Sequence, residues 1–174
     1  MISGFPIDVS EPVATFGFEG RETWVSHRGY IWSRSFPVLF KNIILGSGSD
    51  TFINEFPQGD VVGKLLFMNE PYVTVDKAHN LYIQTGIVTG GISMLALIAL
   101  FGYYIFISFV SLIKPKDGQI NNYGLRLGLF ASVFAFSVSS MATDSTIGST
   151  GVFYIILGMG YALNRIMKKE VDNP

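Results

Sequence analysis

Three long stretches of the chain carry no Asp, Glu, Lys or Arg, namely residues 78–113, 127–143 and 145–164. A helix needs roughly 20 predominantly apolar residues to cross a lipid bilayer. The pattern therefore predicts three transmembrane helices, over residues 90–113, 123–142 and 147–164. The predicted fold class is an α-helical integral membrane protein.

Residues 1–87 mix polar and aromatic positions, and we expect them to form a mostly helical region outside the spans. The first 20 residues are expected to be irregular or β-like. Apolar residues at helical spacing predict a helix over residues 24–45. Its apolar stripe consists of Ile31, Val38, Leu39, Ile43 and Ile44. Pro37 is expected to kink or restart this helix.

Turn and capping residues divide the rest of this region. The sequence GSGSD at 46–50 predicts a tight turn, with Asp50 as the N-cap of a short helix over residues 51–56. Residues 57–74 are expected to form a loop. Asp76 is predicted to cap a helix that contains His79 and Asn80 and runs towards the first span. Three glycines are expected to mark a bend or break in it: Gly86, Gly90 and Gly91.

The composition agrees with a membrane protein. Hydrophobic residues make up 49% of the chain, charged residues make up 14%, and the mean hydropathy is +0.41, which is too apolar for a typical soluble domain. A net charge of −1 argues against a nucleic-acid partner. The chain has no cysteine, so thiolate and disulfide chemistry are excluded.

The distribution of basic residues predicts the membrane topology, because excess Lys and Arg marks the cytoplasmic side. The connector after the first span carries Lys114, Lys116 and Arg126, whereas the connector at 143–150 has no Lys or Arg. Basic residues also occupy the tail at 165–174. Residues 1–87 and the second connector are therefore predicted to be extracytoplasmic and the tail cytoplasmic. Arg126 itself is explained by snorkelling to the interface.

The motifs of several enzyme classes are absent. The chain contains no phosphate-binding loop, no dinucleotide-binding glycine motif, no HExxH and no GxSxG. The two histidines, His27 and His79, show no metal-ligand spacing with the nearby carboxylates. No metal site and no cofactor are predicted.

Arginines and aromatic residues alternate near the start of the predicted helix at 24–45. Arg28 lies four residues after Trp24 and four before Trp32, a spacing that places such residues on one helical face. The segment contains two further arginines, Arg21 and Arg34. The guanidinium of each arginine is a planar fork that matches phosphate oxygens. A phosphate headgroup or lipid diphosphate would suit this cluster. The alternative is that these are interfacial arginines and belt tryptophans that anchor the chain at the membrane.

His79 lies where the chain changes from polar to apolar. An imidazole there can accept a proton or orient a hydroxyl. The alternative is a histidine at a helix start that bonds a backbone carbonyl. Asn80 could hold the turn or bind a ligand hydroxyl, and Lys77 either adds positive charge to a site or is simply solvated.

Two segments resemble the C-terminal region of the O-antigen ligase and polysaccharide polymerase superfamily. They are RGYIWSRSFPVLFKNIILGSGSDTF, from Arg28, and VDKAHNLYIQTGIVTGGISMLA, from Val75. The shared elements are an Arg followed four residues later by Trp, an amphipathic segment, a glycine turn, and an HN-containing motif that leads into a membrane helix. The intervening FPQGDVVGKL strengthens the likeness, which covers roughly residues 20–100 and is nearest to polymerases of Gram-positive surface polysaccharides.

The resemblance implies a metal-independent glycosyltransferase of the bacterial cytoplasmic membrane, with a multi-span GT-C-like fold. Its donor would be a glycan on undecaprenyl diphosphate, and its acceptor a second glycan, a lipid or a protein. Arg28 corresponds to the family's diphosphate-binding loop arginine and His79 to its essential histidine. We therefore predict Arg28 and His79 as catalytic. Further substrate contacts are predicted for Asn80, Trp32, Arg34 and Lys77.

Members of this superfamily usually have ten or more spans and a further functional arginine in an earlier external loop. The chain is therefore expected to correspond to the C-terminal part of such an enzyme, with the N-terminal membrane part as its partner. The alternative is a non-catalytic three-span protein that binds lipid-linked glycan or assists another enzyme. A transporter fragment is less favoured, because the spans hold almost no charge.

Overall fold

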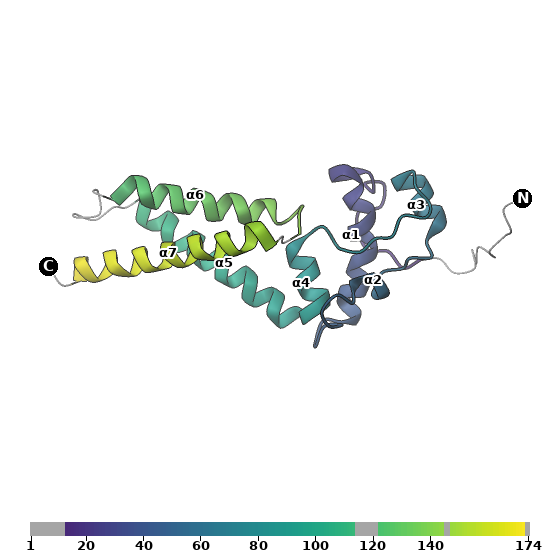
Figure 1. Cartoon of the computed structure of the whole chain (residues 1–174), viewed down its shortest axis with the longest axis horizontal. Coiled ribbons are helices and arrows are strands. Elements are labelled where there is room, and N and C mark those ends of the chain that lie inside the picture. Colours follow the sequence, from purple (N-terminus) through teal and green to yellow (C-terminus); the bar gives the residue numbers. More distant parts are fainter. Residues whose placement is uncertain (1–12, 114–121, 145–146, 173–174) are drawn as a thin grey trace, which may run out of the picture. The chain divides into compact units, whose positions relative to one another are not determined.

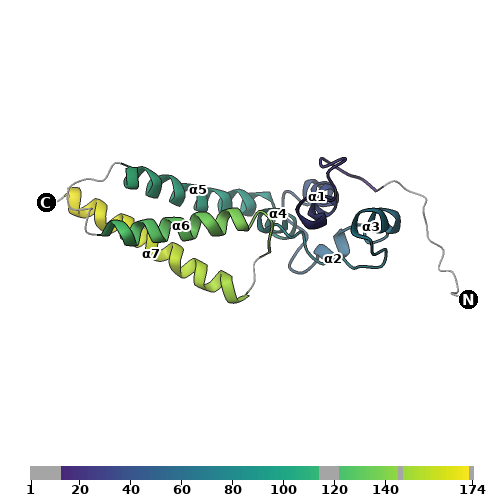
Figure 2. The same cartoon turned by 90° about the horizontal axis from the view of Figure 1, so that it is seen from above.

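The computed structural model describes residues 13–113, 122–144 and 147–172. Within these ranges every regular element is a helix and there is no strand, which confirms the predicted helical class (Figure 1; Figure 2). The chain divides into two compact units. The first unit ends at Met94 and the second begins at Leu95. Residues 13–23 form no helix or strand.

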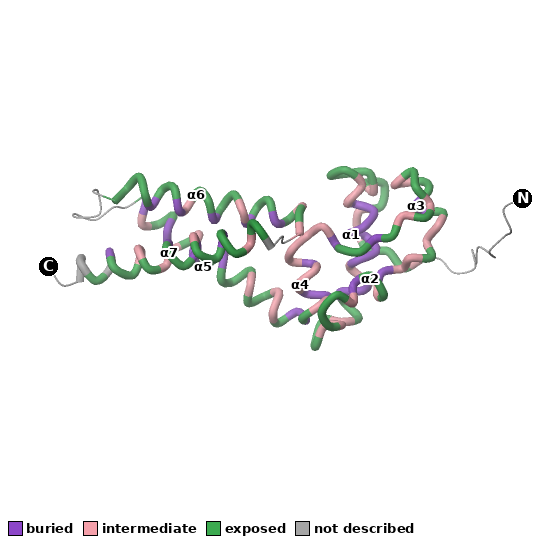
Figure 3. The backbone as a smooth tube through the Cα atoms, in the orientation of Figure 1, coloured by how far each residue is buried: buried purple, intermediate pink, exposed green. Residues whose placement is uncertain are grey.

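The first unit is built around α1 (Trp24–Lys41), which packs against both α3 and α4, while α2 packs against α4. The other helices of this unit are α2 (Phe52–Glu55), α3 (Val61–Met68) and α4 (Leu81–Thr89). Buried residues concentrate on α1 (Figure 3). This arrangement makes α1 the scaffold for the segments that follow it.

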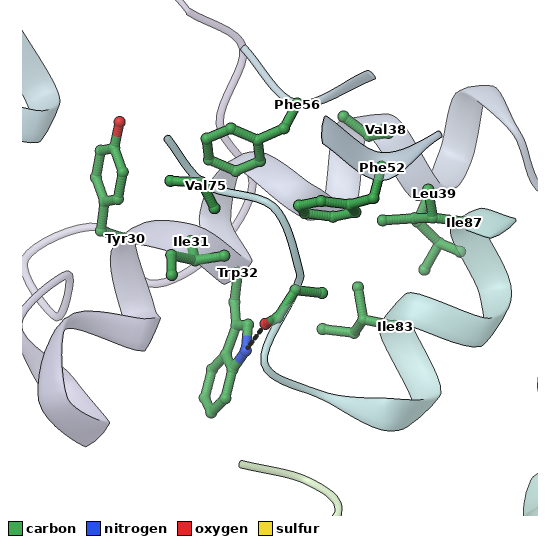
Figure 4. Packing of buried hydrophobic residues seen from close by; sticks show 11 residues of the cluster. Tyr30, Ile31, Trp32, Val38, Leu39, Phe52, Phe56, Val75, Ile83 and Ile87 are labelled. Atoms are coloured by element: carbon green, nitrogen blue, oxygen red, sulfur yellow. Dashed lines mark hydrogen bonds between the residues drawn. The ribbon is translucent and has the colours of Figure 1, made fainter. Parts of the chain in front are cut away.

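Apolar side chains of α1 form the core of the first unit together with residues from α2, α4 and the loops (Figure 4). Ile31, Val38 and Leu39 of the predicted stripe are buried, and each such side chain stabilises the fold by about 1.5–3 kcal/mol. Ile43 and Ile44 lie beyond the end of α1 and are exposed, so their predicted place on the stripe is wrong. The other core residues are Tyr30, Trp32, Phe52, Phe56, Val75, Ala78, Ile83 and Ile87.

The first turn of α1 is not a regular α-helix. Val25, Ser26 and His27 adopt left-handed backbone angles, with φ of 52°, 54° and 67°. Regular helical turns therefore begin at Arg28. The prediction that Trp24 shares a helical face with Arg28 is wrong. Arg28 and Trp32 both lie in the regular part of α1. Pro37 lies inside α1 without ending it.

Two of the predicted helix starts are wrong. Asp50 has a left-handed φ of 57°, and α2 begins after Thr51 instead. The predicted helix from Asp76 does not form: α4 starts at Leu81, with Asn80 as its N-cap and His79 before it. The side-chain oxygen of Asn80 accepts hydrogen bonds from the N–H groups of Tyr82 and Ile83, at 3.0 and 3.1 Å.

The predicted loop at 57–74 contains a helix, α3. Asp60 caps its start, because its Oδ1 accepts a hydrogen bond of 2.9 Å from the backbone N–H of Gly63. α3 spans only eight residues, too few to reveal a helical period in the sequence.

The glycine turn at 46–50 docks on the end of α4. The N–H groups of Ser47 and Gly48 donate to the carbonyls of Ile87 and Val88, at 2.8 and 3.0 Å. These carbonyls belong to the last turn of α4, where no helical partner is available to them. The turn therefore closes the C-terminal end of α4, and the chain breaks at Gly90, whose φ is 94°. The predicted tight turn and the predicted break are both confirmed, although Gly86 lies inside α4.

Gly46 is expected to be a sensitive position in this junction. Its φ is +73°, and an added Cβ would lie 2.3 Å from the carbonyl oxygen of Val88. The left-handed backbone alone costs an alanine about 1–2 kcal/mol, so Gly46→Ala should lower the unfolding free energy by more than that. Thermal unfolding in detergent checks this against Gly59→Ala, where a Cβ meets nothing within 4 Å. Equal stability of the two variants would contradict the docking of the turn.

The second unit contains most of α5 (Gly91–Ile113), with α6 (Tyr123–Ser139) and α7 (Ile147–Asp172). The hydroxyl of Tyr161 donates to the carbonyl of Leu100 at 2.7 Å, and the rings of Phe136 and Phe153 stack with centroids 3.7 Å apart. Each predicted span thus corresponds to a helix. In the part of the chain that the structure describes, α5 is long and apolar enough to cross a membrane and α6 is a shorter apolar helix. This is weak evidence for membrane association.

The predicted tail from residue 165 is helical, because α7 continues through it to Asp172, and its cytoplasmic side stays a prediction. One other part of the topology prediction changes. Arg126 does not snorkel, because only 4% of it is exposed and it donates to the carbonyl of Ser111 at 2.8 Å. Lys114 and Lys116, which support the orientation, lie outside the described residues.

Candidate functional site

Trp32 connects the two segments that hold the predicted catalytic residues. Its indole N–H donates to the carbonyl of Ala78 at 2.9 Å (Figure 4). Arg28 lies one helical turn before Trp32, and His79 follows Ala78 directly. Segments 46 residues apart in the chain are thereby joined in one region of the first unit. Trp32 itself is buried, so its predicted contact with substrate gives way to a structural role.

The backbone on both sides of His79 is fixed. Before it, Ala78 is fully buried, and its N–H donates to Oε1 of Gln84 at 2.9 Å. After it, Asn80 caps α4. His79 has a left-handed φ of 48°, a conformation that costs free energy and persists only where the surroundings impose it. The backbone of His79, a half-buried residue, is therefore held at a defined place at the start of α4.

Arg28 is half-buried and held only weakly. Within the described residues, its side chain makes one hydrogen bond, a long contact of 3.5 Å from Nη1 to the carbonyl of Val25. A guanidinium has five N–H donors, so most of them remain available to a ligand. The neighbouring Arg21 instead lies over the ring of Trp24, 4.7 Å from its centroid.

Arg34 belongs to a buried cluster and is not placed for substrate. Its Nε donates to Oδ2 of Asp60 at 2.6 Å, and its guanidinium lies 4.0 Å from the ring centroid of Tyr30. The hydroxyl of Tyr30 donates to the same oxygen of Asp60 at 3.0 Å. Burial, followed by the charge of Asp60, raises the pKa of Tyr30, which keeps that hydroxyl a donor. We therefore assign Arg34 a structural role in place of the predicted substrate contact.

A second polar group in this region was missed by the sequence reasoning. Lys64 is 3% exposed, and its Nζ donates to the backbone carbonyl and side-chain oxygen of Gln58 at 2.8 and 3.1 Å. Burial lowers the pKa of Lys64, and the charge of Asp60 offsets part of that effect. Gln58 in turn bonds the N–H and the carbonyl of Val75. The stretch FPQGDVVGKL thus supplies the polar contacts that hold the chain before His79.

The remaining predicted residues have simpler positions. Asn80 holds the turn through its capping bonds, which is one of its two predicted roles. Lys77 is exposed. Among the residues that the structure describes, no group of three His, Asp or Glu side chains could hold a metal ion. Of the residues predicted to be catalytic, the arrangement presents the imidazole of His79 and the weakly held guanidinium of Arg28.

Comparison with known proteins gives no further guide to this region. No protein-family model, no curated protein and no solved structure matches the chain. The likeness to the O-antigen ligase and polysaccharide polymerase superfamily accordingly stays a prediction from the motifs.

Proposed function

We propose that the chain is the C-terminal part of a membrane glycosyltransferase that transfers or polymerises undecaprenyl-diphosphate-linked glycan at the outer face of the bacterial cytoplasmic membrane. The observation that carries the proposal is the bond between Trp32 and Ala78, which joins the helix of Arg28 to the segment of His79. The ordered motifs around these residues support the same function. The N-terminal membrane part of the enzyme would complete the site.

In the proposed reaction, the hydroxyl oxygen of the acceptor bonds to the anomeric carbon of the donor sugar. The bond from that carbon to the diphosphate oxygen breaks, and its electron pair leaves with the lipid diphosphate. Arg28 stabilises the negative charge that develops there, since a preorganised donor is most effective where charge appears in the transition state. The hydroxyl loses its proton in this step, and His79 either accepts that proton or orients the hydroxyl while water accepts it.

The position of the proposed site suits a lipid-linked donor. His79 precedes α4, and α4 leads directly into α5, the helix that is long and apolar enough to span a membrane. The diphosphate of such a donor lies at the membrane surface, where its lipid tail anchors it. His79 lies just before the nine-residue α4, and the bond from Trp32 joins the helix of Arg28 to this segment.

Removal of the gene from the source cell tests the proposal. We expect the surface glycan to be lost or shortened and the lipid-linked glycan to accumulate, and we expect an intact copy of the gene to restore both. Extracted lipid-linked and surface glycans are compared by gel electrophoresis and mass spectrometry. Unchanged glycan and no accumulation would contradict the proposal.

A further inference from the structure

We propose that Ile44 and Leu45 insert into the lipid bilayer beside the start of α5 and hold the first unit against the membrane surface. Both side chains are among the most exposed apolar groups of the unit, with 75% and 86% of their surface accessible. This proposal rests on α5 as a membrane span and is independent of any glycosyl transfer.

Ile44 and Leu45 lie in a turn at residues 42–45, directly after α1 and before the glycine turn. This turn is fixed to the start of α5. The N–H of Gly91, the first residue of α5, donates to the carbonyl of Ile43 at 2.6 Å. An added Cβ on Gly90 would lie 2.7 Å from the carbonyl oxygen of Ile44. The backbone of residues 43–44 is therefore packed directly on the junction between α4 and α5.

The length of α5 sets the depth of that junction. Its 23 residues extend about 34 Å at about 1.5 Å per residue, against a hydrocarbon core of about 30 Å. If α5 spans the bilayer, its first residue, Gly91, is placed close to the boundary between headgroups and hydrocarbon, and the backbone of residues 43–44 is packed beside it. Ile92, in the first turn of α5, is likewise 76% exposed.

The polar neighbours of the turn are occupied elsewhere. The amine of Lys41 and the amide of Asn42 both donate to Glu55, at 3.0 and 3.3 Å. The segment at 41–45 is thus amphipathic. Its polar residues, Lys41 and Asn42, bind the end of α2, while its apolar residues are exposed. Ile44 and Leu45 are not members of the buried core of the first unit, which includes Val38 and Leu39. An apolar surface at the membrane boundary is most stable in lipid.

Spin labelling of the full chain tests the insertion directly, because the protein has no cysteine of its own. Single variants Ile44→Cys, Leu45→Cys, Ile92→Cys and Tyr72→Cys carry a nitroxide in vesicles of phosphatidylethanolamine and phosphatidylglycerol. Tyr72 is the matched control, since it is 81% exposed but lies in the loop after α3. Collision with oxygen reports lipid contact, and collision with a water-soluble nickel complex reports exposure to water.

We expect the labels at residues 44 and 45 to behave like the label at 92. Their nickel accessibility relative to oxygen should be several-fold lower than that of the label at 72. Nickel accessibility equal to that at residue 72 would overturn the proposal. Protection from both reagents would also overturn it, because the turn would then be covered by protein, such as a second copy of the chain.

Discussion

Alanine at His79 or Arg28 is expected to abolish glycan transfer while leaving membrane insertion intact. Loss of a positioned proton acceptor lowers a rate by about 10²–10⁴-fold, and loss of a donor to developing negative charge by about 10²–10³-fold. Neither side chain contributes to the buried core, so the fold should tolerate both changes. Polymer is measured in cells that express the complete enzyme, with each variant at the parental level.

Matched variants separate chemistry from folding. Arg21→Ala removes an arginine of the same segment that lies over Trp24, and it should retain most of the activity. Arg28→Lys keeps the charge but loses the planar fork, so a large loss is still expected. His79→Gln can orient a hydroxyl but cannot take its proton, so its activity shows which of these two roles His79 has. Near-parental polymer from His79→Ala or Arg28→Ala would contradict the site assignment.

The apolar pattern predicted the helices well because long runs reflect burial or lipid contact directly. Each predicted span contains a helix, and the stripe at Ile31, Val38 and Leu39 is buried. The capping residues were harder to predict. Asp76 and Asn80 are both good N-cap residues, and the chain between them is fixed at Ala78 by a tertiary contact, the hydrogen bond from Trp32. Such contacts leave no local pattern in a single sequence.

The candidate site was predictable in its residue types but not in its pairings. The motifs indicated Arg28 and His79, but their common neighbourhood depends on a side-chain bond from Trp32 to a backbone carbonyl. Arg34 has the same sequence context as Arg28, with aromatic neighbours. The difference between them is Asp60, which lies 26 residues further along the chain than Arg34 and forms an ion pair with it.

Removing either partner of the Arg34–Asp60 pair is expected to have the largest effect on stability. Their side chains are 8% and 11% exposed, so each single change leaves a charge buried without its counterion. Such a loss costs about 3–5 kcal/mol, and Asp60→Ala also removes the cap of α3. The exposed pair of Lys41 and Glu55 is the matched control, because the lysine side chain is 72% exposed. Lys41→Ala should cost no more than about 1 kcal/mol.

The same pair predicts a loss of stability in acid. Burial raises the pKa of Asp60, but the hydrogen bonds from Arg34 and Gly63 outweigh it, so the pKa lies below its ordinary value of 3.8. The folded chain then binds fewer protons than the unfolded chain near this pH, so the contribution is complete above about pH 4 and is lost as the pH falls through the folded pKa. Asp60→Asn should remove this part of the acid sensitivity. Thermal unfolding of the full chain in detergent, followed by tryptophan emission across this pH range, measures both effects. If Arg34→Ala destabilised the chain no more than Lys41→Ala, the structural role of the buried pair would be wrong.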